Sequence, residues 1–154
     1  MVRQNRGASP ERLIAVDTNL LVYAHRAATP EHPAAVQALR AANRNVQGWG
    51  YSLFSVGEFW RVVTNPTIRG GPSTPEQTSG FLDLLAESGA QCWLPLAGFP
   101  QRLLLHACQL PVVGPQIFDL QIGLICREAG ATELWTHDHN FVALPGLKVF
   151  DPLA

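Results

Sequence analysis

Four carboxylates in this sequence lie in apolar surroundings, and their type and spacing could support chemistry. Asp17 follows the apolar run LIAV, Glu58 lies in YSLFSVGEFW, Asp119 lies in QIFDLQIGLI, and Asp138 comes two residues after ELWT. An unpaired carboxylate is costly to bury in such a place. The other acids lie in polar surroundings typical of solvated faces, caps and turns: Glu11, Glu31, Glu76, Asp83, Glu87, Glu128, Glu133 and Asp151.

The chemistry open to these four acids depends on whether they converge. Two unit charges about 4 Å apart repel by ~1 kcal/mol in water and by ~4 kcal/mol at an effective dielectric constant of 20. Converging carboxylates therefore take up protons or bind a cation. A set of ligands made only of oxygen suits Mg²⁺ or Mn²⁺. A cation held in this way prepares metal-assisted hydrolysis of a phosphodiester.

Each of the four acids also has a purely structural interpretation. Asp17 or Thr18 could cap the helix that follows. Ser55 and Glu58 have the spacing of a capping box. Asp119 falls near the start of its helix, where the macrodipole favours an anion. Asp138 could close an Asx turn.

Short apolar strands alternate with helices along the chain. Strands are expected at 13–16, 48–52, 91–95, 133–136 and 147–150. The helix after the first strand begins near Thr18, and a second covers 29–43, with Thr29 as its cap and Pro30 as its first residue. Further helices are expected at 53–65, 75–89, 99–110 and 114–130. This order predicts a three-layer α/β/α domain around a mainly parallel, roughly five-stranded sheet, with its site at the carboxyl ends of the strands.

Length and composition indicate one domain. The chain has 154 residues, of which 47% are apolar and 15% charged, so it can bury a single core. We expect a flexible N-terminal tail at 1–12 and one domain at 13–154. The formal net charge of −1 gives no long-range basic field.

The cysteines and the hydropathy predict a cytoplasmic protein with no membrane partner. Cys92, Cys108 and Cys126 form no CxxC pair and sit in apolar stretches, which is typical of reduced core cysteines. No apolar run approaches the ~18 residues that a membrane span needs.

Several motifs, taken in order, resemble a known family. VDTNLLVYAH contains Asp17, SVGEFWRVVTNP contains Glu58, and IFDLQIGLICREAGATELWTHDHNF contains Asp119 and Asp138; PGLKVFDPL closes the chain. Together they resemble the PIN-domain ribonucleases of the VapC toxin type, from about residue 13 to the end. The resemblance implies a PIN-like fold and a Mg²⁺- or Mn²⁺-dependent endoribonuclease acting on structured RNA such as tRNA or rRNA. It also implies a homodimer held inactive by a cognate VapB-like antitoxin.

Carried over by position, the resemblance assigns the four acids as both catalytic residues and metal ligands; we call them the acid cluster (Asp17, Glu58, Asp119 and Asp138). Thr18 and Asn19 would orient Asp17 or a water, and Thr136 would support Asp138. Asn140 is a departure, because many relatives carry a further aspartate there. An amide contributes no charge, which weakens the expectation of a second metal.

Arg61 lies one helical turn from Glu58. It could touch RNA, but ordinary pairing with Glu58 at i,i+3 spacing is the expected role. An acidic pocket also attracts arginine, so we expect the antitoxin to insert a basic side chain among the carboxylates.

Two other functions remain open. The chain could be a PIN-like module that binds RNA or a partner without turnover, and the neutral Asn140 faintly favours this. It could also be a zinc hydrolase, because His137 and His139 alternate as paired zinc ligands can. The histidine-rich signature of metallo-β-lactamase-fold hydrolases, however, needs further histidines downstream, and none follows His139.

Overall fold

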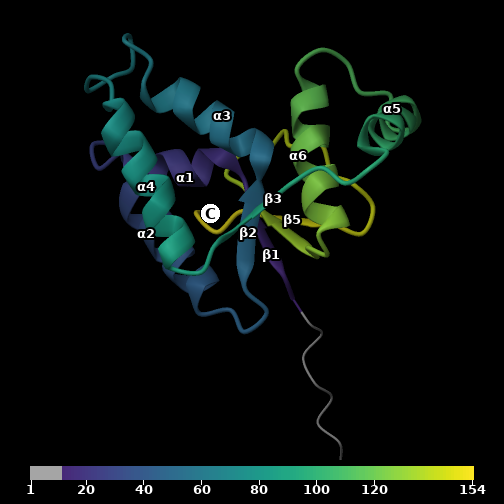
Figure 1. The fold of residues 1–154 in the computed structure, drawn as a ribbon, viewed down its shortest axis with the longest axis horizontal. Helices are drawn as coiled ribbons and strands as arrows, with labels where there is room; N and C mark the ends of the chain where they lie inside the picture. Colours follow the sequence, from purple (N-terminus) through teal and green to yellow (C-terminus); the bar gives the residue numbers. More distant parts are fainter. Residues whose placement is uncertain (1–11) are drawn as a thin grey trace, which may run out of the picture.

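The computed structural model describes residues 12–154 (Figure 1). The tail expected at 1–12 falls, apart from Arg12, outside the described residues. Five strands are present: β1 (Ile14–Val16), β2 (Trp49–Ser52), β3 (Gln91–Trp93), β4 (Glu133–Trp135) and β5 (Lys148–Phe150). Six helices connect them: α1 (Thr18–His25), α2 (His32–Asn43), α3 (Leu53–Val63), α4 (Pro75–Glu87), α5 (Phe99–Gln109) and α6 (Gln116–Glu128).

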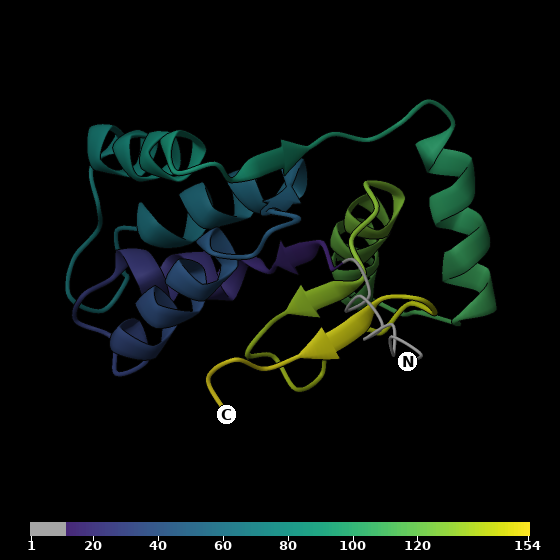
Figure 2. The ribbon, with the colours of Figure 1, turned by 90° about the horizontal axis from the view of Figure 1, so that it is seen from below.

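The strands form one parallel sheet in the order β3-β2-β1-β4-β5. In Figure 2 the arrowheads of β4 and β5 point the same way, toward the side where α1 and α2 lie. The strand order changes direction at β1, whose neighbours are β2 and β4. In an open α/β sheet such a switch point is where ligands bind. The three-layer α/β/α fold and the five-stranded sheet are confirmed.

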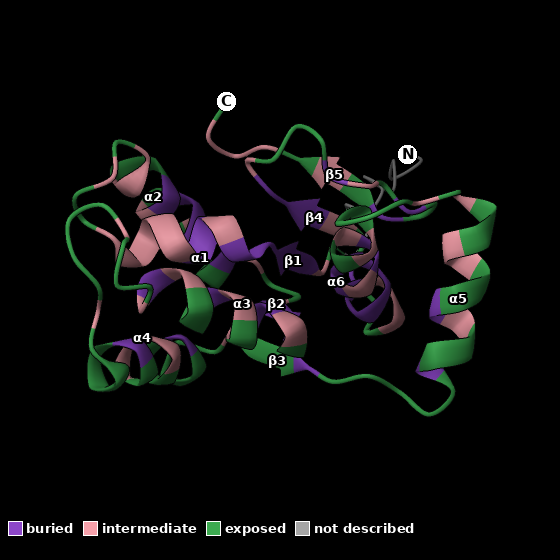
Figure 3. Ribbon diagram, turned by 90° about the horizontal axis from the view of Figure 1, so that it is seen from above, coloured by how far each residue is buried: buried purple, intermediate pink, exposed green. Residues whose placement is uncertain are grey.

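Helices cover both faces of the sheet, which explains why its strands are so apolar. Figure 3 shows α1 to α4 on one side and α5 and α6 on the other. Residues of β1 alternate between two cores: Ile14 and Val16 pack with α1 to α4, whereas Ala15 packs with α6. All three are fully buried.

The start of α2 differs from the prediction. The helix begins at His32, with Pro33 in its first turn, and Glu31 occupies the cap position without a side-chain cap bond. Thr29 is not the cap, because its Oγ1 donates a 2.8 Å hydrogen bond to the carbonyl of Arg26. Thr29 and Pro30 therefore belong to the turn between α1 and α2.

The cysteine prediction holds for one residue of three. Cys126 is buried in α6, whereas Cys92 and Cys108 are exposed. Cys92 lies on β3, an edge strand with a partner on one side only. Within residues 12–154, no helix is long and apolar enough to cross a membrane.

Candidate active site

The acid cluster gathers where the strands end. Asp17 directly follows β1, and Asp138 follows β4, the strand paired with β1. Glu58 lies on α3 and Asp119 on α6, two helices that contact each other. The charges of Glu58 and Asp119 act on Asp17, and those of Asp138 and Glu58 act on Asp119. The four acids singled out in the sequence thus lie in one electrostatically linked region, which Asp138 joins through Asp119.

Asp17 is the most deeply buried acid of the cluster, with 6% of its surface exposed. Its Oδ1 accepts a 2.7 Å hydrogen bond from the backbone N–H of Thr18, and its Oδ2 accepts a 2.8 Å bond from the Thr136 hydroxyl. Burial raises the pKa of Asp17 from 3.8 to about 7. The two hydrogen bonds oppose this rise, and the charges of Glu58 and Asp119 add to it.

Asp17 also caps α1, as its structural interpretation predicted. A cap needs only one carboxylate oxygen and is ordinarily solvated. Here a second oxygen is held by a residue 119 positions away, and like charges lie nearby. Capping therefore does not account for this environment.

Thr136 ties the ends of β1 and β4 together. Besides donating to Asp17, its Oγ1 accepts from the Asn19 side-chain amide at 3.2 Å and from the backbone N–H of Asp138 at 3.1 Å. Asn19 in turn accepts from the backbone N–H of His137 at 3.4 Å. Thr136 thus binds the backbone N–H of Asp138 rather than its carboxylate. The side-chain hydrogen bonds link Asn19 to Asp17 only through Thr136.

Asp138 closes the Asx turn that its structural interpretation predicted. Its Oδ1 accepts a 2.9 Å hydrogen bond from the backbone N–H of Asn140. The side chain of Asn140 makes no part of this contact, and the residue is exposed. The turn orients one oxygen of Asp138, so it does not conflict with a role for the other.

Asp119 lies in the first turn of α6, as expected. Burial raises its pKa, and the charges of Asp138 and Glu58 raise it further, against a backbone hydrogen bond from Val142. The rise in the pKa of Asp119 caused by burial and like charges therefore outweighs the lowering that a helix N-terminus favours.

The capping box expected for Ser55 and Glu58 is absent from α3. The helix begins directly after β2, and Ser52 is its cap, accepting from the backbone N–H of Phe54 at 3.0 Å. Ser55 therefore lies inside the first turn, and its buried hydroxyl has no hydrogen-bond partner. Glu58 is left without a capping role.

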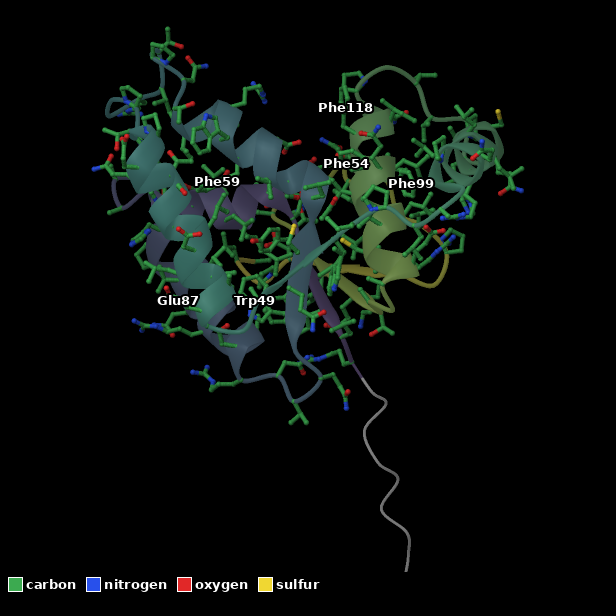
Figure 4. All side chains as sticks on the ribbon, in the orientation of Figure 1. Trp49, Phe54, Phe59, Glu87, Phe99 and Phe118 are labelled. Carbon is green, nitrogen blue, oxygen red and sulfur yellow. The ribbon has the colours of Figure 1, made fainter. Side chains whose placement is uncertain are left out.

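The expected pairing of Arg61 with Glu58 is also wrong. Among the residues that the structure describes, no ion pair within 4.0 Å joins them. Both instead line a pocket of about 410 Å³ between α3 and α6, together with Phe54, Gly57, Phe118, Gln121 and Ile122. Figure 4 labels Phe54 and Phe118 on the facing sides of these helices. Apolar side chains and Arg61 therefore line a pocket that reaches Glu58, one acid of the cluster.

A second polar group near the strand ends joins His137, His139 and Asp151. Asp151 Oδ2 lies 2.9 Å from His137 Nδ1 and 3.7 Å from His139 Nε2. Burial would raise the pKa of Asp151, but a hydrogen bond from the Leu153 N–H and the nearby His137 and His139 lower it overall. From the sequence, Asp151 was expected to be one of the ordinary acids of solvated faces, caps and turns. The signal that could have found it is its place directly after the last strand, at the same edge of the sheet as Asp17.

The acid cluster offers the donor type that a hard divalent cation prefers, although among residues 12–154 no three of its acids present ligand atoms within 4.8 Å of one another. Its donors are carboxylate oxygens, which Mg²⁺ and Mn²⁺ prefer. Burial and mutual repulsion destabilise the ionised form of Asp17, so a bound cation would remove an existing cost. Thr18 adds a buried hydroxyl with no partner, immediately next to Asp17 in the chain.

The sequence matches no family model. Among curated proteins, it is 28% identical over 142 residues to Ribonuclease VapC48 of Mycobacterium tuberculosis, covering 90% of this chain and 96% of that protein. It is 29% identical to Ribonuclease VapC43 of the same organism, covering 92% and 96%.

Solved structures share the fold at lower identity. The crystal structure of M. tuberculosis VapC20, described as a sarcin-ricin loop cleaving toxin, has a TM-score of 0.64 at 17% identity, covering 83% of this chain and 92% of that one. VapBC2 from Rickettsia felis, bound to a DNA fragment from its promoter, has a TM-score of 0.64 at 19% identity, covering 90% and 98%. Sequence likeness to named VapC ribonucleases and the fold of VapC toxins together confirm the resemblance of this chain to the VapC-type PIN-domain ribonucleases.

Proposed function

We propose that this chain is a metal-dependent endoribonuclease and the toxin of a VapBC-type pair. The observation that carries the proposal is the buried Asp17 directly after β1, whose pKa is raised and which lies within the electrostatic reach of Glu58 and Asp119, Asp119 in turn being coupled to Asp138. An environment that destabilises an ionised carboxylate is typical of functional sites. Relatives that cover nine tenths of the chain are named ribonucleases.

In this proposal the acid cluster both holds the metal and forms the catalytic site. A divalent cation bound there, Mg²⁺ or Mn²⁺, supplies activation of a water and neutralisation of charge on the scissile phosphate. Asp17 is fixed by Thr136 and Thr18, so it offers its oxygens in a set orientation. Asn19 and Thr136 act as positioning residues, and the backbone N–H of Asn140 closes the turn that carries Asp138.

Arg61 is proposed to contact the RNA backbone. It lines the pocket beside Glu58 without an ion-pair partner among the residues described, so its guanidinium is free to meet a phosphate. The substrate class is structured RNA, such as tRNA or rRNA, and VapC20 offers a related case as a toxin that cleaves the sarcin-ricin loop.

Cleavage of total cellular RNA by the purified chain tests the proposal. We expect discrete products with Mg²⁺ or Mn²⁺ and none with EDTA. Asp17→Asn removes one charge from the cluster and should lower the cleavage rate at least about 100-fold, as loss of a group that acts on the transition state does. Asp83→Asn is the matched control, because it makes the same chemical change on the exposed surface of α4.

A folded Asp17→Asn protein that cleaves RNA as fast as the Asp83→Asn control would contradict the catalytic assignment. Absence of cleavage by folded, antitoxin-free protein with every metal would favour the catalytically silent binding module instead. A His-ligated zinc hydrolase would require cleavage that depends on Zn²⁺ and His137 rather than on Asp17.

The proposed partner is a VapB-like antitoxin. The pocket between α3 and α6 has apolar walls and reaches Glu58, so it suits an antitoxin segment with apolar side chains and one basic side chain. We expect co-expressed antitoxin to purify with this chain and to block cleavage. Replacing its inserted basic residue by alanine should restore cleavage; unchanged inhibition would refute this mode of binding.

The remaining assignments extend the same proposal. We propose that the nuclease domain comprises residues 13–154 and that the chain acts as a homodimer in the cytoplasm. Light scattering of the purified chain distinguishes the dimer from a monomer.

A further inference from the structure

We propose that His137, His139 and Asp151 form a binding site for a transition-metal ion of the Zn²⁺ class, separate from the acid cluster. Their ligand atoms all lie within 4.8 Å of one another, and no other trio of this kind is found in residues 12–154. The inference does not rest on the proposed ribonuclease function.

The arrangement exceeds what a histidine–aspartate hydrogen bond requires. Such a bond needs one imidazole, and His137 Nδ1 already supplies it to Asp151 Oδ2 at 2.9 Å. His139 nevertheless directs its Nε2 to the same oxygen at 3.7 Å, although its side chain is 75% exposed and free to turn to solvent. The two rings lie side by side, with centroids 5.7 Å apart. Three potential ligand atoms therefore lie within 4.8 Å of one another.

Two of the three ligand spacings are close to those of a metal-bound set. Zinc bonds of about 2.0–2.2 Å in a tetrahedron place neighbouring ligand atoms roughly 3.3–3.6 Å apart. The two observed separations from Asp151 Oδ2, 2.9 and 3.7 Å, lie on either side of this value. Shifts of a few tenths of an ångström would bring both into range, and the exposed His139 can make them.

The supporting contacts already fix two of the three ligands. Asp151 Oδ1 accepts a 2.9 Å bond from the backbone N–H of Leu153, which leaves Oδ2 facing the histidines. The ring of His137 meets Tyr23 edge-on at 6.1 Å. Such outer contacts orient ligands in metal sites.

Ligand chemistry separates this site from the acid cluster. Two imidazoles and one carboxylate suit Zn²⁺ and similar transition metals, whereas an all-carboxylate set suits Mg²⁺ or Mn²⁺. Three protein ligands leave a fourth position for water. A metal here would join the 137–139 segment to the residue that follows β5, and Asp138 of the acid cluster lies between the two histidines.

Calorimetric titration of Zn²⁺ into the metal-free full chain, in excess Mg²⁺, tests the site. We expect one Zn²⁺ per chain. His139→Gln and Asp151→Asn should each weaken binding by more than the roughly 10- to 100-fold that loss of an outer contact costs. His139 is exposed, so its replacement should leave the fold intact, and Asn at 151 can still accept from Leu153.

Two further variants locate the ion. His106→Gln removes a histidine from α5, and Asp17→Asn disables the acid cluster; both should bind Zn²⁺ like the parent chain. Loss of Zn²⁺ binding in Asp17→Asn with retention in His139→Gln would place the ion in the acid cluster and overturn the proposal. Equal affinity of His139→Gln and the parent chain, or no saturable binding to the parent chain, would also overturn it.

Discussion

Asp17 shows at the scale of one residue how the side chain that caps a helix can also be a proposed metal ligand. One oxygen caps α1 and the other is held by Thr136, while burial and two neighbouring acids disfavour its charge. The sequence was sufficient to single out the four acids as candidates, because each stood in apolar surroundings. It could not select Asp151, whose partners His137 and His139 are near only in space, or exclude the pairing of Arg61 with Glu58.

The raised pKa of Asp17 predicts a specific dependence of stability on pH in the absence of divalent metal. The folded state binds a proton more tightly than the unfolded state, so this carboxyl contributes most below pH 3.8. Its contribution is lost as the pH rises through about 7. Between pH 5 and 8 the parent chain should lose roughly 2–3 kcal/mol relative to Asp17→Asn, at about 1.4 kcal/mol per pH unit.

Urea unfolding in EDTA at several pH values measures this difference. Asn at position 17 also loses one hydrogen bond, but that cost is nearly independent of pH and leaves the slope unchanged. Asp83→Asn, on the exposed surface of α4, should follow the parent chain at every pH. A pH-independent difference between the parent chain and Asp17→Asn would show that Asp17 titrates normally.

At the scale of elements, order and type were predictable, and the exact starts were less so. Strand and helix periodicities located all five strands and six helices. The start of α2 depended on whether the Thr29 hydroxyl caps a helix or closes the preceding turn, and sequence spacing cannot separate these. The start of α3 is likewise set by the end of β2, because Ser52, the last residue of the strand, is also the helix cap. The capping-box spacing of Ser55 and Glu58 therefore did not identify the helix start.

Gly50 lies where β2 and β3 approach so closely that a side chain has no room. A Cβ at this position would lie 2.5 Å from the backbone oxygen of Gln91 and 2.8 Å from the ring of Trp93. Gly50→Ala should therefore destabilise the chain by about 1–3 kcal/mol, the usual cost of overpacking. Denaturant unfolding measures the change.

Gly80 on α4 provides the matched control. A Cβ there meets nothing within 4 Å, so Gly80→Ala should stabilise the chain by about 0.5–1 kcal/mol through helix propensity. If the two substitutions changed stability in the same direction, the contact between Gly50 and β3 would not be what limits this position.

At the scale of the whole molecule, the sequence predicts the layers because both faces of the sheet are covered. Runs such as LIAV read as continuously apolar, since Ile14 and Val16 serve one core and Ala15 the other. The meeting of α3 and α6 across the strand ends, which forms the pocket, is a tertiary contact without a local sequence signal. The exposure of Cys92 was missed for a related reason. Cys92 lies on the edge strand β3, and the order of strands in the sheet has no local sequence signal.

The hydroxyl of Thr136 has one hydrogen and two lone pairs, and its three contacts use all of them. Because Asn19 and the Asp138 backbone can only donate to it, the hydrogen can point only at Asp17. The hydrogen-bond network at the strand ends therefore has a single direction, which leads toward the buried carboxylate. For the proposed metal site this means preorganisation, since the Thr136 hydroxyl would not need to reorient when a cation binds Asp17.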